Sequence, residues 1–352
     1  MLGSAAFTLC IGFLAPRHDL RTLLLICALL MVLTGIAFPN AQHFPVLATV
    51  AFIGTINPTT GDIGVHVPLE HAALAQRTSD QDRTRLFARY SLIGALSIAV
   101  GALVAGTPDL LLSLGIGKIA SLRVMFYLYA ALGLVGAAFY SRLPRRPAPK
   151  AEQPAMTLGP SRGTVYKLAG LFSLDAFAGG FAVQSLLALW LFERFELSLA
   201  VASAFFFWSN VLAAFSYLAA ARLGTRFGLI NTMVFTHIPS SICIILAAFS
   251  PDLTFALAVL LVRSALSQMD VPTRTSYVMA VVTSAERTAA ASVTAVPRSL
   301  ASAVSPALSG ALLSTSLLGL PLIICGTLKI VYDFALLFSF RHIKPPEETL
   351  PP

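Results

Sequence analysis

Ionisable residues occur inside long apolar stretches of this sequence, where charged groups are rare. Asp62, His66 and Glu70 follow one another at intervals of four residues, so on a helix they share one face. A charged side chain near the centre of a lipid bilayer costs on the order of 2.5–3.5 kcal/mol on insertion scales. Such groups persist when they are paired, face a cavity or take part in function. This face is therefore a candidate path for a solute or a proton.

A second polar face repeats the first. Arg263, Asp270 and Arg274 are spaced by seven and four residues, and Arg274 lies 204 residues after Glu70 (274−70). We expect Glu70 and Arg274 to lie near the cytoplasmic helix ends and to form a gate, closed by their ion pair in one state and open in another. Alternatively, Asp270 neutralises Arg274 one turn away and Glu70 is solvated in a loop.

Three further positions are candidates. Asp175 lies midway through an apolar stretch, near Gly179-Gly180, which permits a bend or close packing. A carboxylate there suits proton coupling or a cationic substrate, or it is a hydrogen-bonded packing residue. Arg298 lies about ten residues into another apolar stretch and is a further cavity candidate. Lys329 and Asp333 are four apart, which predicts a structural ion pair.

Other chemistry is not visible in the sequence. The six histidines are scattered without metal-ligand spacing, and the four cysteines fall inside apolar runs, which is typical of small buried residues. No phosphate-binding loop or nucleophile arrangement is present, so we expect no metal and no cofactor. A membrane enzyme would need a catalytic cluster at one membrane face, whereas these polar groups are spread through the depth of the bilayer.

The composition indicates an all-α integral membrane protein. Of the 352 residues 57% are hydrophobic and 11% charged, and the mean hydropathy is +0.80; a soluble domain carries about 25% charged residues. Apolar stretches of about 20 residues recur along the chain, and the alternation of a membrane β-barrel is missing. The net charge of +8 needs no nucleic acid partner, because the basic residues concentrate in alternate loops.

The hydropathy pattern predicts eleven spans in two bundles. We expect a bundle at 1–141, a cytoplasmic linker at 142–163, a second bundle at 164–341 and a cytoplasmic tail at 342–352. The spans are 1–15, 20–38, 46–74, 86–105, 122–140, 164–190, 199–223, 229–249, 253–282, 288–314 and 318–340. A basic loop is expected at 77–85.

The distribution of basic residues predicts the orientation. Lys and Arg concentrate in the linker, the tail and the alternate loops, while the opposite loops hold only Lys118, Arg123 and Arg194. The linker and the C-terminus should be cytoplasmic, and Met1 should lie outside. The excess of Arg and Ala is typical of a GC-rich bacterium, which indicates the cell inner membrane.

The two halves also carry related turns. The segment 12–17 matches 221–226 at an offset of 209. These turns resemble the signature Gly-x-Leu-Ala-Asp-Arg-x-Gly-Arg of the major facilitator superfamily, through Gly12, Leu14, Ala15 and Arg17 in the first copy and Gly224, Arg226 and Gly228 in the second. The signature Asp is replaced by Pro16 and Thr225, so both copies lack the residue that helps latch the cytoplasmic side in the family.

The resemblance implies a fold of two pseudo-symmetric six-helix bundles. The eleven predicted spans would correspond to family helices two to twelve, five in the first bundle and six in the second. The apparent lack of the first helix indicates either an incomplete gene model, which we favour, or an eleven-helix variant. In the family, helices one, four, seven and ten line the cavity, so the two polar faces would face each other.

The resemblance also implies a function. We expect a secondary active transporter that moves a small molecule across the lipid bilayer by alternating access, with protons as the coupling ion and sodium as the alternative. Ser305-Pro306 and Ser309-Gly310 resemble part of the family's antiporter motif, which favours export, although ordinary small-residue packing explains them equally well. The alternative is an inactive or scaffolding relative, in which neutral residues could replace Asp62, Arg263 and Asp270 without effect.

Overall fold

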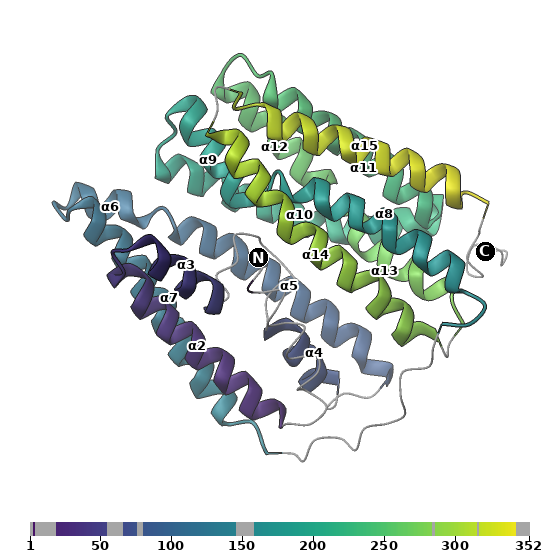
Figure 1. The fold of residues 1–352 in the computed structure, drawn as a ribbon, viewed down its shortest axis with the longest axis horizontal. Helices are drawn as coiled ribbons and strands as arrows, with labels where there is room; N and C mark the ends of the chain where they lie inside the picture. The colour runs from purple at the N-terminus through teal and green to yellow at the C-terminus, as the bar shows by residue number, and fades with distance from the viewer. Residues whose placement is uncertain are drawn as a thin grey trace. The chain divides into compact units, whose positions relative to one another are not determined.

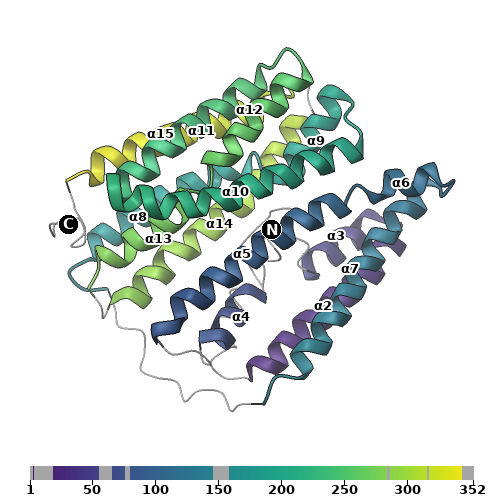
Figure 2. The same cartoon turned by 180° about the vertical axis from the view of Figure 1, so that it is seen from behind.

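A computed structural model of the chain describes residue 3 and residues 19–54, 66–75, 80–145, 158–283, 286–314 and 317–342. Within these ranges the regular elements are helices (Figures 1 and 2). Eight of the described helical segments are long and apolar enough to cross a membrane. The chain divides into two compact units, Met1–Glu152 with Ser198–Ser203, and Gln153–Leu197 with Ala204–Pro352.

The first unit is built on two long helices that lie side by side. Helix α2 (Leu20–Asn40) packs along α7 (Lys118–Ser141), and glycines permit the close approach. A Cβ on Gly35 would lie 2.7 Å from the carbonyl oxygen of Phe126, and one on Gly133 would lie 2.9 Å from Val32. The other described helices of this unit are α3 (Phe44–Ile53), α4 (His66–Ala75), α5 (Asp80–Val104) and α6 (Thr107–Ser113).

The second unit contains eight described helices. They are α8 (Arg162–Gly180), α9 (Gln184–Phe195), α10 (Leu199–Phe227, whose first residues belong to the first unit), α11 (Leu229–Ala248), α12 (Leu253–Leu266), α13 (Asp270–Ala280), α14 (Arg287–Leu313) and α15 (Leu320–Phe340). Helix α8 packs against α14 and α15, and α11 packs against α15, α12 and α13. These packed helices supply the side chains of the site described below.

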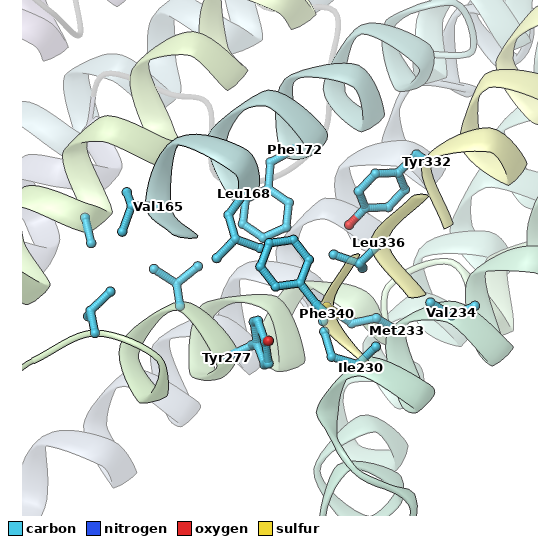
Figure 3. Packing of buried hydrophobic residues seen from close by; sticks show 13 residues of the cluster. Val165, Leu168, Phe172, Ile230, Met233, Val234, Tyr277, Tyr332, Leu336 and Phe340 are labelled. Atoms are coloured by element: carbon cyan, nitrogen blue, oxygen red, sulfur yellow. The ribbon is translucent and has the colours of Figure 1, made fainter. Parts of the chain in front are cut away.

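An apolar cluster joins five of these helices (Figure 3). It lies toward the beginnings of α8 and α11 and the end of α15, with Phe172, Met233 and Tyr332 at its border with the charged residues described below. We call it the apolar cluster; its buried members are Val165, Leu168, Phe172, Ile230, Met233, Val234, Tyr277, Val278, Val282, Ala290, Tyr332, Leu336 and Phe340.

A carboxylate ties the beginning of α8 to the beginning of α14. Glu286 accepts hydrogen bonds from the Thr283 hydroxyl (2.7 Å), the Ser161 hydroxyl (2.8 Å) and the backbone N–H of Gly159 (2.6 Å). These hydrogen bonds, led by that of Thr283, lower the pKa of Glu286 to about 2. The buried Glu286 is therefore ionised throughout the physiological range.

Two spans that the sequence predicts as continuous are broken. The span 164–190 is interrupted between Gly180 and Gln184, where the Ser309 hydroxyl donates to the carbonyl oxygen of Phe181 at 2.8 Å. Glycine weakens a helix, and the serine satisfies one of the carbonyls freed at the helix end. The span 253–282 is likewise interrupted between α12 and α13.

The count of eleven spans is not confirmed. The predicted span 1–15 lies outside the described residues apart from residue 3, and the span 46–74 is described only as α3 and α4. Helix α14 has the length of a span, but its Ser, Thr and Arg residues leave it outside the eight candidates. The expected basic loop at 77–85 is partly helical, because α5 begins at Asp80. The predicted domain boundaries stay predictions.

Candidate functional site

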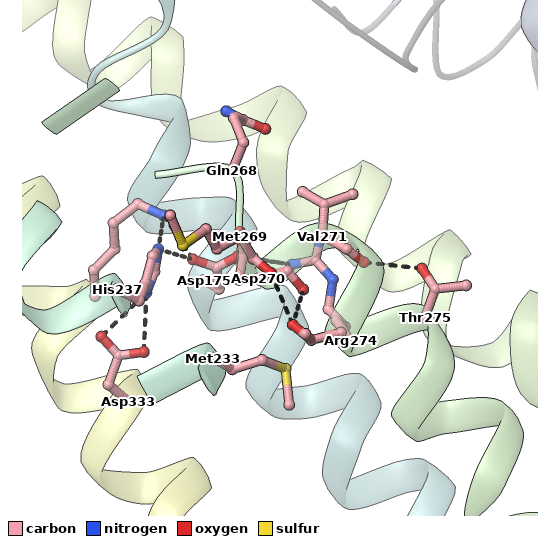
Figure 4. Close-up of polar contacts among 12 residues, drawn as sticks. Asp175, Met233, His237, Gln268, Met269, Asp270, Val271, Arg274, Thr275 and Asp333 are labelled. Atoms are coloured by element: carbon pink, nitrogen blue, oxygen red, sulfur yellow. Dashed lines mark hydrogen bonds and ion pairs between the residues drawn. The ribbon is translucent and has the colours of Figure 1, made fainter. Parts of the chain in front are cut away.

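Ionised and polar side chains from four helices of the second unit meet in one buried network (Figure 4). At its centre is Asp175 of α8, which is 5% exposed. Its Oδ1 accepts a hydrogen bond from Lys329 Nζ at 2.6 Å, and its Oδ2 accepts one from Arg274 Nη1 at 3.1 Å. Two cations from α15 and α13 therefore compensate this carboxylate.

Arg274 bridges two carboxylates. Its Nη1 also lies 3.2 Å from Asp270 Oδ2, one turn earlier on α13. The break after α12 puts Asp270 in the first turn of α13, where the helix dipole favours a negative charge. The guanidinium carbon lies 5.5 Å from the ring centre of Phe172, at the border of the apolar cluster. Arg274 is therefore held on three sides.

His237 of α11 extends the network to α15. Its Nδ1 lies 2.9 Å from Asp333 Oδ1, and its Nε2 lies 3.2 Å from Lys329 Nζ. Both contacts are satisfied when Nδ1 carries the proton and donates to Asp333, while Nε2 accepts from the ammonium group. The same Nε2 is 3.8 Å from Asp175 Oδ1. A second proton on His237 would face Lys329 directly, so protonation and this contact exclude each other.

Two arginines of the unit stand apart from these pairs. Arg298 of α14 is close enough to Asp175, Asp270 and Arg274 to interact with them electrostatically, but makes no hydrogen bond or ion pair with any described residue, and its Nε is buried without a partner. Arg263 of α12 lies in the electrostatic range of the thiols of Cys243 and Cys325, and it too forms no ion pair in the described ranges.

The first unit holds a separate polar cluster around one carboxylate. Glu70 of α4 accepts short hydrogen bonds from the phenol groups of Tyr90 and Tyr140, which lie on α5 and α7. The ring of His66, one turn earlier, stacks on Tyr140 with the ring centres 6.3 Å apart. Glu70 is thus part of a helix and partly buried, and the alternative that it is solvated in a loop is wrong.

The second signature turn is tight. Gly228 is the single residue between α10 and α11, and its φ of +87° favours glycine. Gly224 packs against Leu229, while Arg226 is exposed over the ring of Phe227. Gly12 and Arg17 of the first turn lie outside the described residues.

Some predicted site residues come together and others do not. Asp175, Asp270 and Arg274 meet, and the pairing of Asp270 with Arg274 agrees with the expected neutralisation one turn apart. Arg263 is separated from them by the turn at 267–269, so the expected common face on one continuous helix is wrong. Asp62 lies outside the described residues, and the cavity and gate roles stay predictions.

The predicted Lys329–Asp333 ion pair is wrong. Lys329 pairs with Asp175 and Asp333 with His237, because partners on α8 and α11 compete with the neighbour one turn away. Sequence reasoning missed His237. Its position inside an apolar stretch was the available signal, since a histidine at bilayer depth needs a partner. Among the described residues no group of His, Cys, Asp and Glu could hold a metal ion.

Helices long enough to span a bilayer, with ion pairs buried among them, define a multi-pass membrane protein of the transporter type. The family pattern described as "Major Facilitator Superfamily" matches residues 1–191, more than half of the chain. The chain belongs to the major facilitator superfamily, whose members are transporters and not enzymes.

Sequence and structure comparisons agree with this assignment. The chain is 23% identical to an uncharacterized membrane protein of Saccharomyces cerevisiae, YJR124C, over 92% of this chain and 80% of that protein. A D-xylose–proton symporter has the same fold with a TM-score of 0.74 (17% identity, 99% of this chain, 86% of that one). The nucleoside transporter NupG gives a TM-score of 0.71 (14% identity, 96% and 89%).

Proposed function

We propose that the protein is a secondary active transporter that moves a small molecule by alternating access, with protons as the coupling ion. The buried network of the second unit carries the proposal. Replacing a buried ion pair by apolar residues is often neutral or stabilising, so stability alone does not explain why three carboxylates are kept inside membrane-spanning helices. Transport does explain it, because a bound solute or proton can break one pairing and favour another.

Proton coupling is proposed from the position of His237. In the arrangement described, its Nε2 accepts from Lys329, and Lys329 also holds Asp175. A proton arriving at Nε2 would repel the ammonium group and weaken its contact with Asp175. Histidine is suited to this step because each of its ring nitrogens can hold or release a proton. The D-xylose–proton symporter that shares this fold couples a solute to protons by its name, which supports the same proposal here.

We also propose export as the direction of transport, a cytoplasmic location for the linker and the tail, and a gate formed by Glu70 and Arg274. The packing of Ser305 and Ser309 of α14 against the end of α8 fits the small-residue motif of exporters, and basic residues in the linker and tail favour a cytoplasmic location for both. The Glu70–Arg274 gate would have to compete with the tyrosines that hold Glu70 and with the two carboxylates that hold Arg274. The inner membrane remains the proposed location.

The experiment is transport into liposomes that contain the purified protein and the pH dye pyranine. A metabolite library is first screened for compounds that raise the midpoint of thermal unfolding, and each hit is then added outside. We expect proton movement with at least one hit, lost in His237→Gln and retained in Glu193→Gln, which changes an exposed residue of α9. Solute flux equal to that of empty liposomes for every hit would refute transport, and solute flux without proton movement would refute the coupling.

A further inference from the structure

The charges of the buried network and of the two arginines that stand apart from its pairs do not balance. This group contains the carboxylates Asp175, Asp270 and Asp333 and the permanent cations Arg263, Arg274, Arg298 and Lys329. Three negative charges face four positive ones, which leaves one positive charge when His237 is neutral and two when it is protonated. An unbalanced charge among membrane-spanning helices costs several kcal/mol. The bound state should therefore supply a negative charge.

The carboxylates are already occupied. Asp175 is held by Lys329 and Arg274, Asp270 by Arg274, and Asp333 by His237. A cationic solute could bind one of them only by displacing an existing partner. The network therefore offers a poor site for a cation, although Asp175 alone, as read from the sequence, permits one.

Arg298 and Arg263 both lack an ion-pair partner among the described residues, and Arg298 is the one that has carboxylates of the network in its electrostatic range. It interacts electrostatically with Asp175 and Asp270, but it also faces repulsion from Arg274, and none of these groups reaches hydrogen-bonding distance of its guanidinium. Tyr332, only 1% exposed, also has a hydroxyl group without a hydrogen-bond partner. A guanidinium group presents paired N–H donors that match carboxylate and phosphate oxygens.

We propose that the transported substrate is an anion, with a carboxylate or phosphate group that binds the guanidinium of Arg298 and offsets the excess positive charge to which Arg263 contributes. This inference rests on the proposed transport function and names the substrate class of the same site. The anion enters as the missing partner and leaves the existing carboxylate pairs intact.

The test is thermal unfolding of the full chain in dodecyl maltoside with matched probes at constant ionic strength. Each probe series contains an anion, a neutral compound and a cation of similar size. The first series is succinate, succinamide and putrescine, and the second is benzoate, benzamide and benzamidine. Inorganic phosphate is added separately. We expect at least one anion to raise the unfolding midpoint and the neutral and cationic members of its series to leave it unchanged. Its apparent affinity should fall at least about tenfold in Arg298→Gln, which corresponds to about 1.4 kcal/mol, because the variant loses its charge-assisted hydrogen bonds to the anion.

A matched control separates specific binding from a general salt effect. Arg341→Gln removes an exposed arginine at the end of α15 and should leave the shift unchanged. A shift caused only by neutral or cationic probes, or an anion shift that persists in Arg298→Gln, overturns the proposal. Stabilisation by phosphatidylglycerol alone also overturns it, because a lipid headgroup would then be the partner of Arg298. A third contrary result is an anion that raises the unfolding midpoint only in Asp62→Asn, because Asp62 would then be the group that neutralises Arg298 in the unmodified chain.

Flux separates this inference from the proposed function. An anion that binds through Arg298 but does not cross the membrane of protein-containing liposomes confirms the anion site and refutes transport. A neutral or cationic compound that crosses in a protein-dependent way confirms transport and refutes the anion site.

Discussion

Replacing Asp175 by Asn tests the central ion pairs of the network. The substitution preserves the shape of the side chain and removes its charge. Arg274 keeps a carboxylate partner, because Asp270 remains 3.2 Å away. Lys329 loses its only carboxylate partner among the described residues. The main consequence is therefore an unpaired ammonium group on α15.

The magnitude follows from that unpaired charge. Breaking a buried pair by removing one partner destabilises a protein by about 3–5 kcal/mol. The Asn amide oxygen can still accept one hydrogen bond from Lys329, so we expect the low end, about 3 kcal/mol. Removing both charges in Asp175→Asn with Lys329→Met should recover at least about 1 kcal/mol of this loss, because the double variant leaves no unpaired charge at this contact.

The assay is denaturant unfolding in detergent, followed by tryptophan fluorescence. Both tryptophans of the chain, Trp190 and Trp208, lie in the second unit and report on its unfolding. Glu193→Gln is the matched control and should stay within about 0.5 kcal/mol of the unmodified chain. A loss below about 1 kcal/mol in Asp175→Asn, or a double variant no more stable than the single one, would show that the described pairing does not stabilise the unit.

Three further predictions concern other contacts. Gly180→Ala should lower the unfolding free energy by about 1–3 kcal/mol, because its Cβ would collide with the Ser305 hydroxyl of α14. The control Gly170→Ala meets no atom within 4 Å and should be neutral or stabilising, and equal effects of the two variants would contradict this packing. Tyr140→Phe should lower it by about 1.5–3 kcal/mol by removing a hydrogen bond to the Glu70 carboxylate, and no change in denaturant unfolding would refute that bond. Glu286→Gln should reduce the loss of thermal stability on acidification, because the pKa of Glu286 is about 2 in the folded chain, below its ordinary 4.5. The stabilisation by its carboxylate is therefore present above pH 4.5 and is lost as the pH falls toward 2. An unchanged dependence of stability on pH would argue against the hydrogen bonds that hold Glu286.

The sequence predicts the helical membrane fold because apolar length is a local property that each stretch carries by itself. It also places Asp175, Asp270 and Arg274 within long apolar stretches, and the pairing of Asp270 with Arg274 follows from their spacing. The partners of Lys329 were not predictable in this way, because they come from α8 and α11, 154 and 92 positions away. A spacing of four favours the local pair with Asp333, but tertiary packing supplies better-placed acceptors.

The helix breaks were missed for a related reason. Hydropathy averages over about 20 residues and does not register a turn of three residues inside an apolar stretch. The turn between α8 and α9 depends on a hydrogen bond from Ser309, and that between α12 and α13 precedes Asp270 directly. The first break is therefore a property of α14 as much as of the stretch that contains it.

The apolar cluster beside the network limits the movement of protons within the second unit. Its thirteen buried side chains lie between the network and the beginnings of α8 and α11, and all of them except Tyr277 and Tyr332 lack a hydroxyl or ionisable group. Phe172, Met233 and Leu336 therefore offer no hydrogen-bonded relay to a proton on His237. While this packing holds, the network of the proposed proton-coupled transporter can carry a proton without an uncoupled leak of protons through the cluster.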